Sequence, residues 1–410
     1  MLNTKDITVL HISPSYKPAY CYGGPTLSVA KLCEALNISD NGMNVRVFTT
    51  TANGATELEY SSGSVRNIEG VEVFFYSRLT KDHTHFSPAL LFNLYRYVKR
   101  ARADACPLIL HIHSWWNMVA ILAAGLAKLL GVPTIISPRG MITDYTLSFR
   151  NTVVKFLIHN LLGKRLLKNA HLHATTAMEA NHIMRFIANT NISVIPNLLT
   201  LHAEDICSKT AYGLNRVDPS WNTMELPALN RHLNILFLSR IDRKKGLETL
   251  LRALASLKFS WSLTVAGSGA ASYVRYLKQM SGMLKISRNV NWIGQVGNEA
   301  KSQLMFNHDL LVLPSSNENF GNVVLESLLV GTPVLISDHV GLASYVKTAD
   351  LGWICPAESA VIAQTLSEIS LDISKRMKIR NSAPNRIRRD FNTETIINQY
   401  VKMYKKALLN

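Results

Sequence analysis

Two glutamates, Glu318 and Glu326, stand on either side of a glycine just after an apolar run of the sequence. The run predicts a buried strand whose following loop carries Glu318, and Gly321 allows a tight turn into a helix. The backbone N–H groups of Phe320, Gly321 and Asn322 would then be free at the helix start, where they can bind an anion. Both carboxylates border that place, which predicts a ligand with a central phosphate and hydroxyl-bearing sugars on either side.

The same segment continues to Gly331-Thr-Pro333, and it resembles the Glu-x7-Glu element of the GT4 (group 1) retaining glycosyltransferases, which have the GT-B fold. A second segment agrees with this resemblance. In that family an Arg and a Lys bind the nucleotide diphosphate, and they match Arg240 and Lys245 here. An arginine can bind two phosphate oxygens with its forked guanidinium, while a lysine adds a point charge. The neighbouring Arg243 and Lys244 are interpreted as residues of a solvated surface.

Weaker motifs fall in the order that the resemblance implies. The pair Gly23-Gly24 resembles the N-terminal glycine loop whose backbone approaches the donor diphosphate. Gly267 lies in a segment that resembles the donor-side glycine turn, and Gly294 in one that resembles the segment holding the nucleobase. The residues that the resemblance assigns to donor binding are Gly23, Gly24, Gly267, Gly294, Asn319, Phe320, Gly321, Asn322 and Glu326. The candidate catalytic residues are Glu318, Arg240, Lys245, His113 and Arg139.

Arg139 departs from the family pattern. Many relatives carry a His-Gly dipeptide after the corresponding strand, and that histidine helps to place the donor sugar, whereas here the pair is Arg139-Gly140. An arginine cannot act as a base at neutral pH, but it can bind a phosphate or an acidic acceptor; a structural role is the alternative. His113, at the end of another predicted strand, is expected to make a polar contact in the cleft. His111 is expected to point to the opposite face as a core histidine.

The resemblance implies that the anomeric configuration of the transferred sugar is retained. It casts Glu318 as a contact to donor-sugar hydroxyls and Glu326 as a contact to the nucleotide ribose. The sequence contains no Asp-x-Asp motif, and no set of His, Asp and Glu residues has the spacing of metal ligands. We therefore expect no metal and no cofactor beside the nucleotide-sugar co-substrate, with Arg240, Lys245 and helix dipoles neutralising the leaving diphosphate.

These residues need a scaffold that brings distant loops together. Short β-branched runs alternate with amphipathic segments, which predicts right-handed βαβ crossovers and mostly parallel sheets covered on both faces. The predicted strands are Thr8–Ile12, Asn44–Thr50, Val71–Tyr76, Leu108–His113, Thr134–Pro138, His171–Thr175, Ser193–Ile195, Leu233–Ser239, Ser262–Ala266, Val290–Ile293, Leu310–Pro314 and Pro333–Ser337. The predicted helices are Thr26–Asn37, Pro88–Arg102, Met118–Leu130, Val153–Asn169, Ala177–Phe186, Gly246–Leu257, Ala271–Ser281, Asn298–Asn307, Asn322–Val330 and Thr393–Leu408.

The alternation breaks near Pro196-Asn197 and restarts after a polar, turn-rich stretch, residues 200–231. We therefore predict an α/β fold of GT-B type. It has a Rossmann-like acceptor-binding domain in residues 1–200, a Rossmann-like donor-binding domain in residues 201–392, and a helix in residues 393–410 that packs back toward the N-terminal domain. The two doubly wound domains are expected to face a central cleft at the carboxyl ends of their strands, where ligands of such sheets bind.

The chain is strongly basic, since 44 Lys and Arg residues against 28 Asp and Glu residues give a formal charge of +16. This excess predicts an anionic partner. Two basic stretches suit contact with an anionic membrane, namely Phe149–Lys168 and Lys375–Arg389. The alternative, that they are ordinary solvated helix faces, is equally favoured. The five cysteines are scattered, the N-terminus lacks a signal-peptide pattern, and no apolar run reaches the ~20 residues of a membrane span. We therefore expect a cytoplasmic protein, with peripheral contact at the inner face of the membrane as an option.

Together these features predict a metal-independent, retaining glycosyltransferase. It would move a sugar from a nucleotide-diphosphate donor to a saccharide or lipid-linked saccharide during synthesis of a bacterial surface polysaccharide such as O-antigen, capsule or exopolysaccharide. A nucleotide-sugar epimerase on the same fold is the first alternative, but no additional acid–base set is visible in the sequence. A basic nucleic-acid-binding protein is the least favoured, because the tryptophans do not interleave with the basic clusters and no reader motif occurs.

Overall fold

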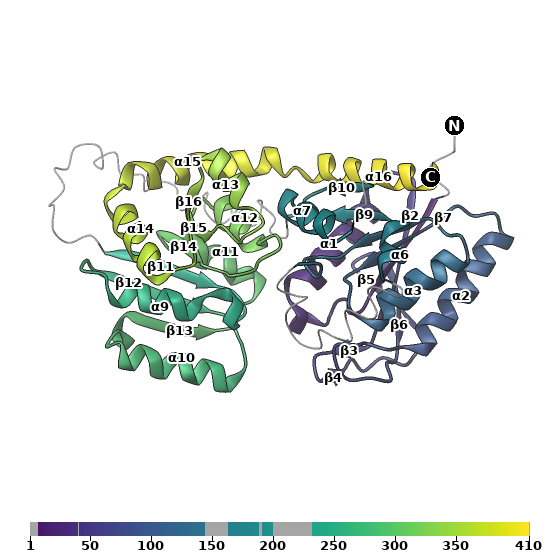
Figure 1. Cartoon of the computed structure of the whole chain (residues 1–410), viewed down its shortest axis with the longest axis horizontal. Coiled ribbons are helices and arrows are strands. Elements are labelled where there is room, and N and C mark those ends of the chain that lie inside the picture. Colours follow the sequence, from purple (N-terminus) through teal and green to yellow (C-terminus); the bar gives the residue numbers. More distant parts are fainter. Residues whose placement is uncertain (1–6, 40, 144–162, 188–190, 200–231, 410) are drawn as a thin grey trace. The chain divides into compact units, whose positions relative to one another are not determined.

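The computed structural model describes residues 7–39, 41–143, 163–187, 191–199 and 232–409. The chain divides into two compact units, one formed by Met1–Leu198 with Thr393–Asn410 and the other by Leu199–Asn392. Each unit is built on a sheet of mainly parallel strands with helices packed against it (Figure 1). The predicted fold class, two Rossmann-like α/β domains, is confirmed.

In the described part of the first unit, eight strands form one sheet in the order β10-β9-β8-β7-β1-β2-β6-β5. Neighbouring strands are parallel except β5 and β6. The direction of strand order reverses between β1 and β7, the kind of place where such sheets bind ligands. The strands are β1 (Ile7–Ser13), β2 (Met43–Thr50), β5 (Ser64–Ile68), β6 (Val71–Tyr76), β7 (Leu108–His113), β8 (Thr134–Ser137), β9 (His171–Ala174) and β10 (Ile192–Val194), with a small pair β3 (Ala52–Asn53) and β4 (Thr56–Glu57) outside this sheet.

The two faces of this sheet differ in chemistry because side chains alternate along each strand. Leu10 and Ile12 of β1 and Leu110 and Ile112 of β7 share a hydrophobic core with α2 and α3. The intervening positions of the same strands carry histidines, which face the other side of the sheet. The helices of this unit are α1 (Gly24–Ile38), α2 (Pro88–Ala103), α3 (Met118–Leu129), α6 (Lys164–Lys168), α7 (Ala177–Phe186) and α16 (Thr393–Leu409), with a 3-10 turn η2 (Tyr20–Tyr22) before α1.

The C-terminal helix α16 packs on the first unit, as predicted (Figure 1). Two of its tyrosines are fully buried against the histidine-bearing face of the sheet. Tyr404 Oη lies 2.9 Å from His111 Nδ1, and Tyr400 Oη lies 3.2 Å from His173 Nε2. Helix α16 thus completes the interior of the first unit, and Tyr404 provides the hydrogen-bond partner of the buried His111 Nδ1.

In the described part of the second unit, six parallel strands form a sheet in the order β13-β12-β11-β14-β15-β16. Here the strand order reverses between β11 and β14. The strands are β11 (Leu233–Leu238), β12 (Trp261–Ala266), β13 (Val290–Gly294), β14 (Leu310–Leu313), β15 (Val334–Ser337) and β16 (Gly352–Cys355). The helices are α9 (Leu247–Ala255), α10 (Ala271–Met283), α11 (Asn298–Phe306), α12 (Asn322–Leu329), α13 (Ala343–Ala349), α14 (Ser359–Leu371) and α15 (Ile373–Asp390), with 3-10 turns η6 (Arg243–Lys245) and η7 (Ser287–Asn289).

The loops after β11, β12 and β14 pack backbone against backbone, and glycines make this possible. A Cβ on Gly267, whose φ is +145°, would clash with the carbonyl oxygen of Ser239, and one on Gly246, at φ +72°, would clash with the carbonyl oxygen of Pro314. No side chain fits at either position. These two glycines therefore set how closely the three loops approach one another.

The predicted strands and helices are confirmed to within a few residues. One helix is tested only in part: of the helix predicted at 153–169, residues 153–162 lie outside the described residues. The stretch 200–231 lies outside them too. The elements that the sequence patterns did not reveal include the edge strand β5, the short strand β16, and the helices α13, α14 and α15.

The basic stretch 375–389 lies on α15, and some of its cations share two carboxylates. Lys375 and Lys378 form ion pairs with Asp350, and Arg386 and Arg389 with Asp390. Arg380 donates hydrogen bonds to two backbone carbonyls. Most of the basic stretch 149–168 lies outside the described residues. No helix in the described ranges has the length and apolarity needed to cross a membrane.

The packing of α16 predicts the effect of Tyr404→Phe. This change removes the hydroxyl that donates to His111 Nδ1 and leaves a buried nitrogen without a partner, so we expect a loss of about 1–2 kcal/mol in the free energy of unfolding. Chemical denaturation measures this loss. Tyr95→Phe, at a tyrosine that is 41% exposed on α2, is the matched control, and equal stability of the two variants would contradict the anchoring role of Tyr404.

Candidate active site

In the second unit, Lys245 and Glu318 form an ion pair across two loops. Lys245 ends the 3-10 turn after β11, and Glu318 lies in the loop after β14, the neighbouring strand. Their side chains are 12% and 20% exposed. The structure therefore brings together two of the predicted catalytic residues at the carboxyl ends of adjacent strands, where they remain accessible to a ligand.

The backbone around this pair is fixed by hydrogen bonds between loops. Ser316 N–H donates to Lys244 O at 2.8 Å, which joins the loop after β14 to that after β11. Glu318 N–H donates to His339 O, and its own carbonyl accepts from Gly341 N–H. The loops after β11, β14 and β15 thus hold the Lys245–Glu318 pair in place from both sides.

Helix α12 begins directly beside Glu318. Gly321 is its N-cap in the left-handed conformation, with φ +90°, and no side chain caps the helix start. A Cβ on Gly321 would lie 3.0 Å from Val340 Cγ1 and 3.5 Å from Glu318 Cγ. Phe320 is buried, and Asn319 and Asn322 flank the turn. This geometry provides the helix N-terminus that the sequence predicted as an anion site.

Glu326 is almost fully buried on α12, with a side chain that is 4% exposed, and it forms an ion pair with Lys301 of α11. The sequence analysis did not single out Lys301. Its role depends on the packing of α11 against α12, and a lysine on a helix carries no local signal of such a partner. The pair compensates the buried charge of Glu326 and fixes the position of its carboxylate.

The basic run after β11 is more buried than predicted. Arg240 and Arg243 are exposed, and the Arg243 guanidinium stacks 5.3 Å from the centre of the Tyr273 ring. Lys244, predicted as a solvated residue, is instead half-buried. Burial lowers its pKa, and the charges of Arg240 and Lys245 lower it further. The prediction for Lys244 was wrong because Lys244 is partly buried in η6, where the charges of Arg240 and Lys245 act on it.

The predicted glycines of the second unit lie in the same set of loops. Gly267 follows β12, and its N–H donates to Gly294 O at 2.7 Å. Gly294 ends β13 at φ +74°, with open space around its Cα. The chain at Gly267 therefore approaches the end of β11, whereas Gly294 lies one strand farther along the sheet.

In the first unit, Gly23 and Gly24 stand where β1 leads into α1. Gly23 is the N-cap residue at φ +68° and ψ −135°, and Gly24 is the first residue of the helix. No side chain caps this helix start, and no acidic residue lies in its first turn. The helix therefore begins with backbone N–H groups and a positive dipole end, as an anion site requires.

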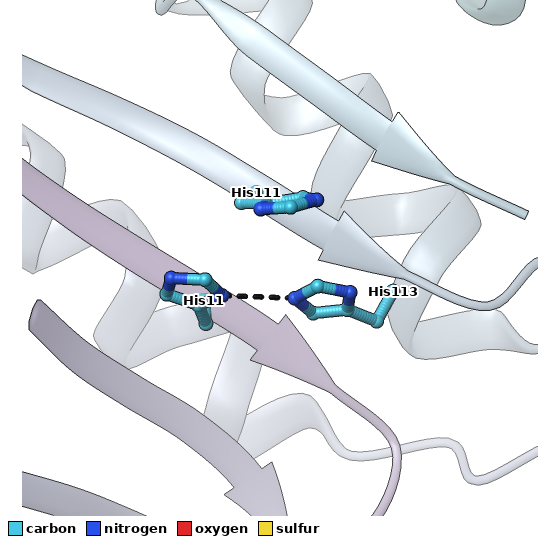
Figure 2. A group of neighbouring side chains, drawn as sticks. All are labelled: His11, His111 and His113. Atoms are coloured by element: carbon cyan, nitrogen blue, oxygen red, sulfur yellow. Dashed lines mark hydrogen bonds between the residues drawn. The ribbon is translucent and has the colours of Figure 1, made fainter. Parts of the chain in front are cut away.

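Five buried histidines lie on the polar face of this sheet, namely His11, His111, His113, His171 and His173. All of them except His171 belong to the cluster described below, and Figure 2 shows three of them. His11 of β1 and His113 of β7 are stacked, with Nδ1 and Nε2 2.9 Å apart, and the His111 ring centroid lies 4.1 Å from that of His113. His111 and His113 therefore share one face, and the prediction that His111 points to the opposite face was wrong. Residues two apart on a strand lie on the same side of the sheet.

Arg139 follows β8 at φ +52° and contacts this cluster. Its Nε donates to His113 Nδ1 at 3.3 Å, and its Nη1 donates to Ser28 Oγ and to Asn197 Oδ1, both at 3.1 Å. His113 is fully buried, so it holds Arg139 in position from within the domain.

These contacts determine where each proton lies. An arginine only donates, so His113 Nδ1 accepts, and His113 donates from Nε2 to His11 Nδ1. A second chain runs from Tyr404 O–H to His111 Nδ1, from His111 Nε2 to Ser137 Oγ, and from Ser137 to His173 Nδ1. It ends where His173 Nε2 donates to Ile195 O, a group that only accepts. Burial lowers the pKa values of all four histidines, which favours the neutral imidazoles that this arrangement requires.

The group His11, His111 and His113 has ligand atoms within 4.8 Å of one another and is the one such metal-compatible group among the described residues. However, the unprotonated ring nitrogen of each histidine already accepts a hydrogen bond. His11 accepts from His113, His111 from Tyr404, and His113 from Arg139. The Arg139 cation beside it also opposes a divalent ion. The geometry therefore favours a hydrogen-bonded network over a metal centre. Sequence spacing could not reveal the group, because its members come from separate strands.

Each of the two units matches a known protein-family model. The model described as "Glycosyl transferase 4-like domain" matches residues 23–198, and the model described as "Glycosyl transferases group 1" matches residues 226–386. The first unit thus matches a glycosyl transferase 4-like domain and the second a group 1 glycosyl transferase domain, in the order that the sequence motifs implied. Neither match points to an epimerase.

An uncharacterised glycosyltransferase of Methanocaldococcus jannaschii is 31% identical over 177 residues, which are 42% of this chain and 45% of that protein. The putative colanic acid biosynthesis glycosyltransferase WcaL of Escherichia coli is 25% identical over 187 residues, which are 43% of this chain and 45% of WcaL. The matched stretch thus spans less than half the length of these relatives. Two solved structures share the fold over 97% of this chain: a sucrose-phosphate synthase from Thermosynechococcus elongatus (TM-score 0.71, 20% identity, 98% of that chain) and Anabaena HepE in complex with UDP and glucose (TM-score 0.69, 19% identity, 99% of that chain).

The histidine network predicts an acid-sensitive first domain. Burial, followed by the charge of Arg139, lowers the pKa of both His11 and His173 to about 3. The pKa values of His111 and His113 are also well below the usual value, mainly because of burial. The unfolded chain therefore takes up protons first as the pH falls below about 6.5, and stability is lost between about pH 6.5 and 3, by at most about 1.4 kcal/mol per pH unit for each histidine.

Denaturation at pH 7, 6 and 5 measures this slope. We expect His11→Gln to reduce it by the contribution of one histidine, because Gln keeps an acceptor for His113 but cannot be protonated. His83→Gln, at an exposed histidine, is the control and should leave the slope unchanged. If wild type and His11→Gln had the same slope, the claim that folding lowers the pKa of His11 would be contradicted.

Proposed function

We propose that this protein is a glycosyltransferase that moves a sugar from a nucleotide-diphosphate donor to a saccharide acceptor, with retention of the anomeric configuration. The observation that carries the proposal is the Lys245–Glu318 pair beside the start of α12. It combines a cation and a helix N-terminus, which suit phosphate, with a carboxylate, which suits sugar hydroxyls. The matches to two glycosyltransferase domain families support this choice.

In this proposal the donor binds to the second unit. Arg240 and Lys245 neutralise the diphosphate, the first turn of α12 adds backbone N–H groups, and Gly267 allows the close packing of the loop beside it. Glu318 accepts hydrogen bonds from the donor-sugar hydroxyls once the diphosphate takes its place beside Lys245. Glu326, held by Lys301, accepts from the ribose hydroxyls. Gly294 lies at the end of the next strand, near where a base would extend. The UDP complex of HepE, a protein of the same fold, is consistent with a nucleotide partner.

The leaving diphosphate gains negative charge as the glycosidic bond breaks, and fixed positive groups stabilise that charge most effectively when they are already in place. Arg240, Lys244 and Lys245 supply three cations at one strand end, and α12 supplies its dipole. These groups can replace a metal ion, so we propose that transfer is independent of metal and of any cofactor other than the donor.

For the acceptor, we propose a saccharide, lipid-linked in one form, of a bacterial surface polysaccharide, on the N-terminal unit. The similarity to WcaL, a putative colanic acid biosynthesis glycosyltransferase, and the basic charge of the chain support this assignment. Among the described residues, the ion pairs on α15 involve only two carboxylates, Asp350 and Asp390, so this stretch keeps an excess of positive charge. The proposal of a cytoplasmic enzyme at the membrane face therefore rests on both basic stretches and on the nature of the acceptor.

The first test is mutation of the pair. We expect Lys245→Ala and Glu318→Ala each to lower transfer by at least about a hundredfold while the protein stays folded, because each removes a charged group from the donor site (about 3 kcal/mol or more). Transfer of radiolabelled sugar measures the loss, and circular dichroism checks the fold. Arg243→Ala is the matched control, since Arg243 belongs to the same basic run but stacks on Tyr273. Turnover near wild type in either Lys245→Ala or Glu318→Ala would refute the site.

The second test identifies the donor. Thermal-shift screening of UDP-, GDP- and ADP-sugars should show stabilisation by one nucleotide class, because a ligand that binds only the folded state raises its melting temperature. The transfer assay with that donor should be unchanged by excess EDTA, and NMR of the product should show the donor's anomeric configuration. Loss of activity in EDTA that is restored by a divalent ion would contradict the metal-independent step, and an inverted product would contradict retention.

A further inference from the structure

Arg139 is a half-buried cation whose hydrogen-bond partners are all neutral. They are His113, Ser28 and Asn197, each of them buried. Within the residues that the structure describes, no carboxylate forms an ion pair with Arg139. Arg78 gives the contrast, since this buried arginine of the same unit pairs with Glu57 at 2.6 Å. An arginine drawn into a protein without a counter-charge is costly, which indicates that its counter-charge comes from a ligand.

The guanidinium is oriented for such a ligand. Nε is committed to His113, and Nη1 is shared between Ser28 and Asn197, whereas Nη2 makes no hydrogen bond to the described part of the chain. Three fixed acceptors on two edges hold the plane of the group, and the third edge is left for binding. The direction of each proton in the chain from Arg139 through His113 to His11 also requires Arg139 to be the donor. The network thus positions a binding arginine and cannot relay a proton from it.

The surroundings of Arg139 include the buried carboxylate of Glu179, which accepts hydrogen bonds from Gly140 N–H and from Thr175 and forms no ion pair with Arg139. Ser28, one of the acceptors, lies on α1, whose N-terminus is uncapped and has no acidic residue in its first turn. His11 and His113 are neutral, because their burial, and to a lesser extent the charge of Arg139, lowers their pKa values. Arg139 follows β8, next to β7 in the sheet, at the carboxyl ends where ligands bind.

We propose that Arg139 binds an anionic group, a carboxylate or a phosphate, of the acceptor substrate. The assignment to the acceptor rests on the proposed function, whereas the anion site rests only on the contacts of Arg139. The enzyme would then select acidic or phosphorylated saccharides over neutral ones, and the donor diphosphate would use its own cations in the second unit. This gives Arg139 a role in specificity, with His113 and His11 as positioning residues behind it.

The test measures anion binding by the full-length protein without turnover. The background carries Arg240→Ala and Lys245→Ala, so that the donor site does not bind the probes. Glucuronate, inorganic phosphate and neutral glucose are titrated by calorimetry and followed by the Arg Nε–H signals in NMR. We expect glucuronate or phosphate to bind and to shift the Arg139 Nε–H signal, and glucose to do neither. Preference for glucuronate would identify a carboxylate, and preference for phosphate a phosphorylated acceptor.

Arg139→Lys should weaken anion binding by about tenfold or more, because it keeps the charge but loses the planar fork. Arg185→Met, at an exposed arginine of α7, is the control and should bind as the background does. Anion affinity unchanged in Arg139→Lys together with an unshifted Nε–H signal would overturn the proposal, as would equal binding of glucose. The Nε–H signal is measured in the background protein, with Arg139 itself unchanged, and no assay of sugar transfer is involved, so a failure of the proposed function would be distinguishable from a failure of this proposal.

Discussion

The close contact of backbone with backbone at the ends of β11, β12 and β14 is the constraint on which the candidate donor site depends. A side chain at Gly246 or Gly267 would collide with a carbonyl of the neighbouring loop. With glycine at both positions, the loop after β11 approaches the loop after β14 closely enough for Lys245 to reach Glu318. The positions of the charged side chains are therefore fixed by the packing of the main chain. They are in place before any ligand binds, as electrostatic stabilisation requires.

The first unit solves a different problem, that of burying polar groups. One face of its sheet is apolar and packs on α2 and α3, whereas the other carries histidines that must be satisfied without water. Tyr404 and Tyr400 of the last helix provide donors or acceptors from the other end of the chain, and Arg139 provides another donor from the loop after β8. The result is a set of neutral imidazoles in two directed chains of hydrogen bonds. One of these chains begins with Arg139 as the donor and ends at His11. Among the ring nitrogens of the four clustered histidines, His11 Nε2 is the one without a hydrogen-bond partner in the described residues.

Local patterns were sufficient to predict most of the fold. β6, β7 and α7 have the predicted bounds, because apolar alternation and capping residues such as Thr176 act within a few residues. β5 is an exposed edge strand with little apolar pattern, β16 begins with a glycine, and α15 is polar with a proline inside, so each lacked a sequence signal. The Glu318–Gly321–Glu326 motif was readable for the same reason, since its geometry is local.

The remaining features of the site depend on contacts between distant segments. Lys301 reaches Glu326 only because α11 and α12 are neighbours, and the histidine group forms only because β1 and β7 are adjacent in the sheet. Likewise, the burial of Lys244 follows from the way η6 turns beneath the loop after β14. The central claim, that Lys245, Arg240 and the start of α12 bind the diphosphate of a nucleotide sugar, is tested most directly by a crystal structure with the nucleoside diphosphate that stabilises the protein best. We predict phosphate oxygens in hydrogen-bond contact with Lys245 and with the backbone N–H groups at Gly321 and Asn322. A diphosphate bound away from these groups would contradict the account.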